Sequence, residues 1–387
     1  MPQRSNRVID NDTVYLDNNA STPIDSRVLE TLTAAHLEFY GNPSNTLHSM
    51  GKSAQKALSQ ARDAIRDLLC ANEFQVIFTS GATEALNLAI VGLNPSRVII
   101  GSTEHKAVIE TCRWLMHERK VDVYRFLVDT QGRADVGDVQ KALHQPTSLV
   151  AAMLANNETG AIHPIEEIAG LTRDYRVPLL CDISQAVGKM SVRVGDLGAD
   201  MVVLSGHKIY GPKGIGALLY HRSLSGKLTP VIHGGGQEFG LRSGTENVPS
   251  AVAFAKAIEI GVTEQTTNVQ QMKNLRDLFE TTLCRLTSGI IINSSDACRL
   301  PNTTNISVVG VDIEGIFELI KPLAISTGSA CGSQEVAGSH VLRAMGVPDA
   351  LAANSLRVSF GRQNTSRQSV IAAEIIANAI NRVRSDP

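Results

Sequence analysis

The sequence has no strong excess of either charge, few aromatic residues and no long apolar run. Its 387 residues carry 36 Lys and Arg against 38 Asp and Glu, and only 4% are aromatic. Proteins that bind nucleic acid or anionic membranes directly usually show a basic excess, so neither activity is expected here. No apolar run approaches the roughly 18 residues of a membrane span, and the first seven residues lack the apolar core of a secretory signal. We therefore expect a cytoplasmic protein that contacts neither nucleic acid nor membrane directly.

Paired cysteines are also missing. No two of the six cysteines are closer than 14 residues, so the C-x-x-C pattern of zinc and dithiol redox sites is absent, and no metal site is predicted. A folded chain of this length buries roughly 75% of its unfolded surface and needs no disulfides. Six reduced thiols are the default, and the open question is whether one of them differs from the rest. They are Cys70, Cys112, Cys181, Cys284, Cys298 and Cys331.

What the sequence does have is a regular alternation of apolar runs and helical patterns. The apolar runs are rich in Val, Ile and Leu and show little polar alternation, as in strands covered by helices on both faces. This alternation predicts an α/β domain with a largely parallel sheet. The expected strands are residues 75–79, 97–100, 121–127, 149–154, 177–181, 201–204 and 215–220, with helices that include 84–91, 107–118 and 165–174.

After about residue 260 the pattern changes. In 355–360, three apolar residues alternate with Arg357 and Ser359, which is typical of a strand with one buried face. We interpret residues 18–260 as a large domain, and residues 1–17 with 261–387 as a smaller α+β domain. In the smaller domain we expect helices at 268–286 and 366–384 and strands at 305–309, 324–326 and 355–360.

Polar residues follow five of the strands expected in the large domain, at the point where each strand ends. In open parallel sheets, ligands bind beyond the carboxyl ends of the strands, so these residues are expected at one edge of the sheet. Together they supply a Thr, a His, an Asn, an Asp/Gln pair and a Lys, which describes a binding site. The five segments are 80–84, 101–105, 156–160, 182–185 and 205–208.

Three of these features together predict a site for pyridoxal phosphate (PLP). The turn at 81–83 opens a predicted helix, whose free N–H groups can hold a phosphate. Asp182 ends an apolar run, so its shielded carboxylate needs a cationic partner such as a protonated pyridine nitrogen. Lys208 follows a buried strand, where a partly desolvated amine can form a Schiff base. A phosphate turn, a carboxylate and a lysine are the three fixed points of a PLP site, whereas the glycine patterns of nucleotide sites are absent.

Each feature taken alone has a plainer reading. The turn at 81–83 could be an ordinary helix cap, and Asp182 could belong to a structural ion pair. His105 could stack on a cofactor ring or act as an acid/base, but a single histidine after a strand is more often structural. Lys213 competes with Lys208 as the Schiff-base lysine, although its Gly-Pro-Lys-Gly loop is expected to be more exposed. Their combination at one sheet edge favours the PLP site.

A set of motifs lies in one order along the chain, from residue 15 to about 362. With these motifs the chain resembles the cysteine desulfurases of the nitrogen-fixation and iron–sulfur-cluster type. These are class-V aminotransferases with the PLP-dependent aspartate-aminotransferase fold (fold type I), so the resemblance implies a mainly parallel seven-stranded sheet in the large domain. The motifs are YLDNNA (15–20), GNPS (41–44), TSGATE (79–84), TEHKAV (103–108), NNETG (156–160), SGHKIYGPKG (205–214), GGGQE (234–238), RSGT (242–245) and GSAC (328–331).

The resemblance assigns a role to each motif residue. Lys208 would carry PLP, Asp182 would pair with its ring nitrogen, and Gln185 would pair with its ring hydroxyl. His105 would stack on the ring. The phosphate would be held by Ala82, Thr83, Ser205 and His207, with Thr245 supplied by the other subunit of a homodimer. Asn157, which is also expected to contact the cofactor, and Arg357 would hold the substrate carboxylate.

Two of the assigned residues have support in the sequence itself. Arginine suits bidentate recognition of a carboxylate, although a surface strand arginine is the plainer reading of Arg357. Cys331 lies in a small, polar segment, whereas the other cysteines mostly lie among apolar residues or on helices. A cysteine that meets a substrate and then an acceptor needs a mobile loop and access to the thiolate state. We expect this catalytic loop at about 326–338.

The reaction implied by the resemblance converts L-cysteine to L-alanine. Lys208 would remove the Cα proton, His105 would serve the proton transfers, and the sulfur would pass to Cys331 as a persulfide. An acceptor protein would then use it for iron–sulfur clusters, thiolated tRNA or sulfur-modified DNA. The alternative is a selenocysteine lyase or another PLP enzyme of this fold. A non-catalytic assembly partner is disfavoured because Lys208, Asp182, His105 and Cys331 are all present.

The sequence departs from the family pattern at three places. Phe239 stands where the family usually has a basic residue, so any charge contact of that residue is not expected here. Gly332 and the pair Ala337-Gly338 replace the usual Thr and Glu-Pro in the catalytic loop. The chain ends at Pro387, directly after the expected closing helix, so recognition of an iron–sulfur scaffold through a C-terminal tail is not expected.

Overall fold

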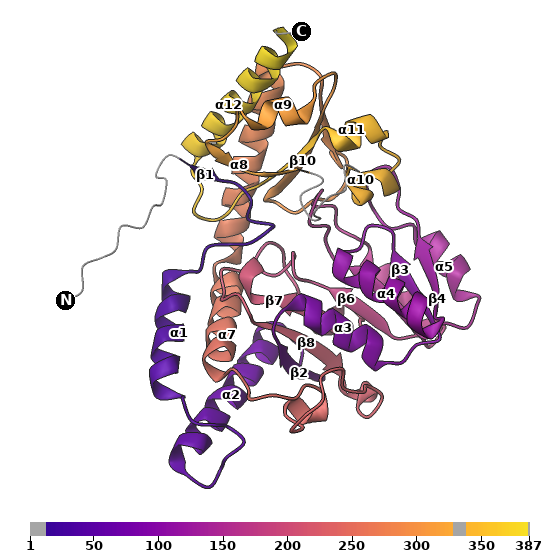
Figure 1. Cartoon of the computed structure of the whole chain (residues 1–387), viewed down its shortest axis with the longest axis vertical. Helices are drawn as coiled ribbons and strands as arrows, with labels where there is room; N and C mark the ends of the chain where they lie inside the picture. The colour runs from indigo at the N-terminus through magenta and orange to yellow at the C-terminus, as the bar shows by residue number, and fades with distance from the viewer. Residues whose placement is uncertain (1–12, 328–337, 386–387) are drawn as a thin grey trace, which may run out of the picture.

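The computed structural model describes residues 13–327 and 338–385, and a seven-stranded sheet forms its centre (Figure 1). All strands are parallel except β8, which pairs antiparallel with both of its neighbours. This confirms the predicted α/β fold with a mainly parallel sheet. Across the sheet the order is β2 (Phe74–Thr79), β8 (Gly216–His221), β7 (Met201–Ser205), β6 (Leu179–Asp182), β5 (Leu149–Met153), β3 (Arg97–Gly101) and β4 (Asp122–Phe126).

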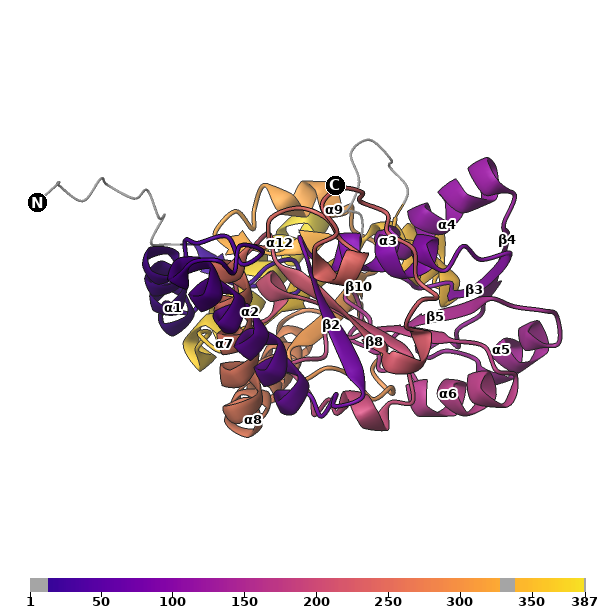
Figure 2. The same cartoon turned by 90° about the horizontal axis from the view of Figure 1, so that it is seen from below.

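Helices cover both faces of this sheet, as the apolar strands require. Alternate strand residues belong to different cores: Val150 and Ala152 of β5 belong to one, and Leu149 and Ala151 belong to the other. The first core contains α1 (Ser26–Glu38), α2 (Ser49–Leu68), α5 (Val136–Leu143), α6 (Ile165–Asp174) and α7 (Val248–Thr263), and the second contains α3 (Ala82–Gly92) and α4 (Lys106–Arg119). Figure 2 shows α3 and α4 on one side of the sheet and α5 and α6 on the other.

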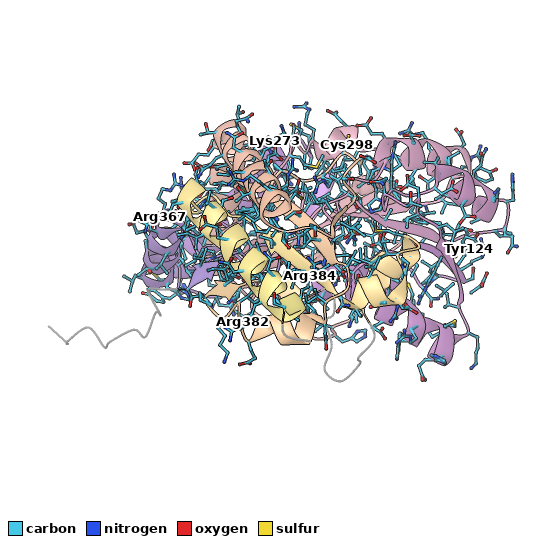
Figure 3. All side chains as sticks on the ribbon, turned by 90° about the horizontal axis from the view of Figure 1, so that it is seen from above. Tyr124, Lys273, Cys298, Arg367, Arg382 and Arg384 are labelled. Carbon is cyan, nitrogen blue, oxygen red and sulfur yellow. The ribbon has the colours of Figure 1, made fainter. Side chains whose placement is uncertain are left out.

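The last third of the chain forms a second sheet, which is antiparallel. Its order is β12 (Ser326–Thr327), β13 (Ser355–Ser359), β10 (Thr303–Val308) and β9 (Ile290–Asn293). It shares an apolar core with α8 (Gln265–Leu286) and α12 (Ser366–Ser385), which lie side by side (Figure 3). The Ser369 hydroxyl donates to Leu275 O at 2.7 Å across this helix pair. Three short helices complete the region: α9 (Ile313–Phe317), α10 (His340–Ala344) and α11 (Asp349–Ala353).

The strand expected at 324–326 is in fact two short strands. β11 (Leu323–Ala324) pairs with β1 (Val14–Tyr15), whereas β12 pairs with β13 in the second sheet. A single apolar run does not show that the chain changes its pairing strand within five residues. The consequence is functional, because β1 and the bridge between Asp17 and Ser359 bring residues 15–20 beside β13.

The predicted division into two domains falls within one of the helices. The boundary at residue 260 lies in the last turn of α7, and α8 follows after one residue. The division at this residue stays a prediction.

Within the described ranges no helix is long and apolar enough to cross a membrane, and no group of three His, Cys, Asp or Glu side chains could hold a metal ion.

Candidate active site

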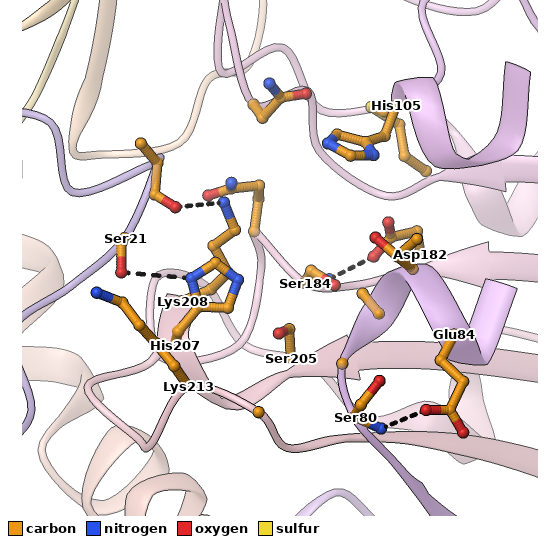
Figure 4. A pocket seen from close by; sticks show the side chains of 18 of the residues that line it. Ser21, Ser80, Glu84, His105, Asp182, Ser184, Ser205, His207, Lys208 and Lys213 are labelled. Carbon is orange, nitrogen blue, oxygen red and sulfur yellow. Dashed lines mark hydrogen bonds between the residues drawn. The ribbon is translucent and has the colours of Figure 1, made fainter. Parts of the chain in front are cut away.

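The carboxyl ends of the parallel strands open on a cavity of about 510 Å³ (Figure 4). Nine of the ten residues predicted to bind a cofactor line it: Ala82, Thr83, His105, Asn157, Asp182, Gln185, Ser205, His207 and Lys208. The tenth, Thr245, is exposed outside the cavity; it was predicted to act in the other subunit of a dimer. Cys331 lies outside the described residues. Five loops that are distant in sequence therefore meet at one place, as the strand-end argument expects.

The start of α3 forms one end of the cavity. Ala82 begins the helix, and Gly81 precedes it without any side-chain cap, so the N–H groups of the first turn have no helical partner. The turn packs closely on β8, because a Cβ on Gly216 would lie only 2.7 Å from Gly81 Cα. The buried Ser184 hydroxyl, which also lines the cavity, has no hydrogen-bond partner among the described residues. These donors fit a phosphate and a polar ring.

Asp182 and His105 lie together on one side of the cavity (Figure 4). Asp182 ends β6, and its Oδ1 accepts a hydrogen bond from Ser184 N at 2.8 Å. His105 caps α4, and its Nδ1 accepts from Ala107 N at 3.1 Å. Burial lowers the pKa of His105, and the Lys208 charge lowers it further, although Asp182 acts in the opposite direction. A neutral imidazole that accepts at Nδ1 carries its proton on Nε2, so His105 has a donor available at that atom.

Lys208 lies on the opposite side, in the turn after β7 (Figure 4). Its Nζ donates to two backbone carbonyls, Asn19 O at 2.6 Å and Ala20 O at 2.8 Å. These two contacts hold the amine in place. Lys213 lines the same cavity but is exposed, whereas Lys208 is half-buried. The geometry therefore favours Lys208 as the lysine that forms a covalent bond.

His207 provides a pH-dependent test of the phosphate end. Burial and the charges of Lys208 and Lys213 lower its pKa to about 4, so the imidazole is neutral at pH 7 in the protein alone. A phosphate bound beside it would favour the charged form, so its pKa is expected to rise when PLP is added. NMR titration of the ring protons, assigned with His207→Asn, measures both values. A pKa near 6.5 without PLP, or an unchanged value with PLP, would contradict this placement.

Arg357 reaches the junction between the two sheets from β13. It is only 4% exposed, which excludes the surface-arginine reading. Its Nη2 donates to Asp17 Oδ1 at 2.7 Å and to Ser326 Oγ at 2.8 Å, and its Nη1 donates to Asn157 O at 3.3 Å. Its buried Nε has no partner among the described residues. The Nη1 contact places the guanidinium next to Asn157, which lines the cavity, and a guanidinium with an orphaned donor fits a carboxylate ligand.

Several residues at the site had no individual role in the sequence-based prediction. Asn19 lies behind Lys208, and Lys189 contacts both Asn19 and Gln185. Glu104 is fully buried beside His105; burial, with a smaller contribution from Asp182, raises its pKa to about 8. Asn19 and Glu104 lie inside the motifs quoted above, so the sequence did indicate that they belong to the site. Lys189 lies in none of them.

Phe239, which replaces a usual basic residue, makes a contact of another kind. The Arg62 guanidinium lies over the Phe239 ring at 5.2 Å and over the Phe78 ring at the same distance. Arg62 also pairs with Glu238 at 2.7 Å. The neighbouring loop is therefore tied to the sheet by an ion pair and ring stacking, and 60% of Phe239 remains exposed.

Comparisons with known proteins agree with this site. The class-V aminotransferase family model matches residues 14–369. Cysteine desulfurase IscS of Rickettsia bellii is 38% identical over 377 residues, which cover 96% of this chain and 92% of that protein. The solved NifS-like protein of Rickettsia africae has a TM-score of 0.85 at 31% identity, covering 96% of this chain and 99% of that one. A structure described as SspA in complex with cysteine has a TM-score of 0.79 at 34% identity, covering 91% and 100%.

The fold and the cavity thus define a PLP-dependent enzyme of fold type I. The chain belongs to the class-V aminotransferase family and, within it, to the cysteine desulfurases. Pyridoxal 5'-phosphate is the cofactor of this family, and the donors around the cavity fit it.

Proposed function

We propose that this chain converts L-cysteine to L-alanine by transferring the substrate sulfur to Cys331. The Cys331 thiol gains one sulfur atom and becomes a persulfide, while the substrate keeps its carbon skeleton and leaves as alanine. The observation that carries the proposal is the meeting of Lys208, Asp182 and the uncapped start of α3 in one cavity, with buried Arg357 next to its rim.

Different cavity residues would bind different parts of the cofactor. Asp182 would face the ring nitrogen, Gln185 the ring hydroxyl, and His105 the ring face. The phosphate would lie at the first turn of α3, contacted by Ala82, Thr83, Ser205 and His207, with Thr245 of the second subunit. When bound, PLP supplies an electron-withdrawing ring that stabilises negative charge at the substrate Cα.

The remaining chemistry belongs to the protein side chains. The Lys208 amine would take the Cα proton, and its contacts with Asn19 O and Ala20 O hold it at the cavity for this role. His105, with its proton on Nε2, would serve the proton transfers of the reaction. Cys331 would act as the thiolate that accepts sulfur.

Replacing Arg357 should mainly weaken substrate binding. Arg357→Lys loses the paired donors of the guanidinium, so we expect the KM for L-cysteine to rise by about tenfold or more, as for a lost charged hydrogen bond. The affinity for PLP should stay within about twofold, since Arg357 does not line the cofactor cavity. Steady-state kinetics and a PLP titration measure the two effects. An unchanged KM would contradict the assignment.

The oligomeric state and the sulfur acceptor are also proposals. A homodimer is supported by apolar side chains exposed near Thr245, namely Val231, Ile232 and Phe239. A sulfur-acceptor protein would take the persulfide, and the near-neutral net charge of −2 favours reaching any nucleic-acid target through that partner. A cytoplasmic location stays a prediction.

The direct test is a product assay. Purified protein loaded with PLP should release alanine and, with a reductant, sulfide in equal amounts from L-cysteine. Parallel assays with L-selenocysteine and with amino-acid and keto-acid pairs address the alternatives. Alanine formed from selenocysteine but not from cysteine would indicate a selenocysteine lyase. Amino-group exchange without sulfide would indicate an aminotransferase.

A further inference from the structure

Lys189 is a buried lysine that the proposed chemistry does not use. It lies four residues after Gln185 in a turn and does not line the cavity, and only 5% of it is exposed. Buried lysines are rare unless a carboxylate pairs with them. Yet none of the ion pairs in the described part of the chain includes Lys189. The cost of burying this amine therefore needs another explanation.

The contacts of Lys189 are amide oxygens. Its Nζ donates to Gln185 Oε1 at 2.6 Å and to Asn19 Oδ1 at 3.2 Å. A lysine ammonium has three donors and no acceptor. The two ends of a glutamine amide are nearly alike in shape, so only their hydrogen-bond partners decide which end faces which way. While its amine is charged, Lys189 is a donor-only partner, so it excludes the orientation that would place the Gln185 NH2 group against Nζ.

The other end of Gln185 is fixed consistently. Its Nε2 donates to Asn19 O at 2.9 Å, and the same carbonyl accepts from Lys208 Nζ at 2.6 Å. Asn19 is itself held in place, because its Oδ1 also accepts from Asn302 Nδ2 at 3.0 Å. Nε2 carries two hydrogens, and the contact with Asn19 O uses one of them. The second hydrogen remains on Nε2, and the Gln185 side chain lines the cavity.

We propose that Lys189 is a positioning residue for the cofactor: by donating to Gln185 Oε1, it keeps the Gln185 NH2 group turned toward the cavity, where it donates to the ring hydroxyl of PLP. This inference rests on the proposed function and on the placement of PLP in this cavity. Without Lys189, only the contact with Asn19 O opposes rotation of the amide, and a rotated amide would place its carbonyl oxygen against the ring oxygen. Two acceptors then face each other, which weakens cofactor binding.

The test compares Lys189→Met, which removes the donor, with Lys189→Arg, which keeps a donor-only group. We expect Lys189→Met to raise the Kd for PLP by about tenfold and the pH midpoint of the visible absorbance by about one unit. The midpoint rises because a ring oxygen without a donor keeps more negative charge and holds the neighbouring proton more tightly. Lys189→Arg should keep both values close to those of the wild type.

A double-mutant cycle separates positioning from a general loss of packing. In a Gln185→Met background, adding Lys189→Met should change neither value further. Two results would overturn the inference. One is a midpoint and a Kd in Lys189→Met equal to those of the wild type. The other is that Lys189→Met causes the same shift in the Gln185→Met background. If Lys189→Met melts below the assay temperature, Lys189→Gln takes its place, because its amide accepts either orientation of Gln185. Wild-type protein that binds no PLP would count against the proposed function itself.

Discussion

Replacing Cys331 with alanine is expected to abolish sulfide release from L-cysteine while leaving PLP bound. Removing the group that accepts a transferred atom lowers the rate far more than weakening a contact does. We therefore expect the rate of sulfide release to fall by at least about 10²-fold. The visible absorbance of the bound cofactor should persist, because no cavity residue changes. Sulfide formation, alanine formation and the absorption spectrum measure these effects.

The described residues on either side of the catalytic segment support this expectation. Before it, Ser326 of β12 pairs with Arg357 in the second sheet. After it, the Ser339 hydroxyl donates to Glu158, and His340 Nε2 lies 2.9 Å from Glu104 O, the residue before His105. Both ends are therefore held beside the proposed substrate site.

A second cysteine variant provides the control. Cys298 is an exposed free thiol that does not line the cavity, so Cys298→Ala should retain sulfide release. Equal losses in both variants would indicate a general effect of thiol removal. Full activity in Cys331→Ala would refute the persulfide mechanism.

The large sheet and the cavity were predictable because both follow local rules. Apolar runs mark buried strands, and polar residues directly after them mark the binding edge. Asn19 could not be assigned a contact in this way. It binds Gln185, Lys208 and Thr303, which are 166, 189 and 284 positions away. The same limit applies to Arg357, whose alternating strand is typical of a surface but is covered on both faces in the fold.

Several cationic groups lie at or beside the cavity, and they shift the pKa values of their neighbours. Burial, followed by the charges of Lys208 and Arg357, lowers the pKa of Lys189 to about 7. Burial together with Lys208 also lowers the pKa values of His105 and His207. Lys208, Lys213 and Arg357 are cationic groups at or beside the cavity, where they favour anionic ligands. The phosphate of PLP and the carboxylate of L-cysteine are both of that kind.

Lys208→Ala is expected to have the other large effect, because it removes both the covalent bond to the cofactor and the base for the Cα proton. Loss of a positioned base alone costs about 10²–10⁴-fold in rate. The absorbance of lysine-bound PLP should disappear, while some PLP remains bound without a covalent bond through the phosphate end and Asp182. Spectra before and after borohydride reduction distinguish the two forms, because reduction fixes PLP to the protein only where the bond to lysine exists.

Lys213→Ala is the matched control for this variant, since Lys213 lines the same cavity but is exposed. It should keep the absorbance and the borohydride-fixed cofactor, and peptide mapping should place the label on Lys208. A label on Lys213 would reverse the assignment of the two lysines. The geometry argues against that result: Lys208 Nζ is held by Asn19 O and Ala20 O, beside the Gln185 amide that also binds Asn19 O. The same backbone carbonyl therefore places the reactive amine next to the group proposed to bind the ring hydroxyl.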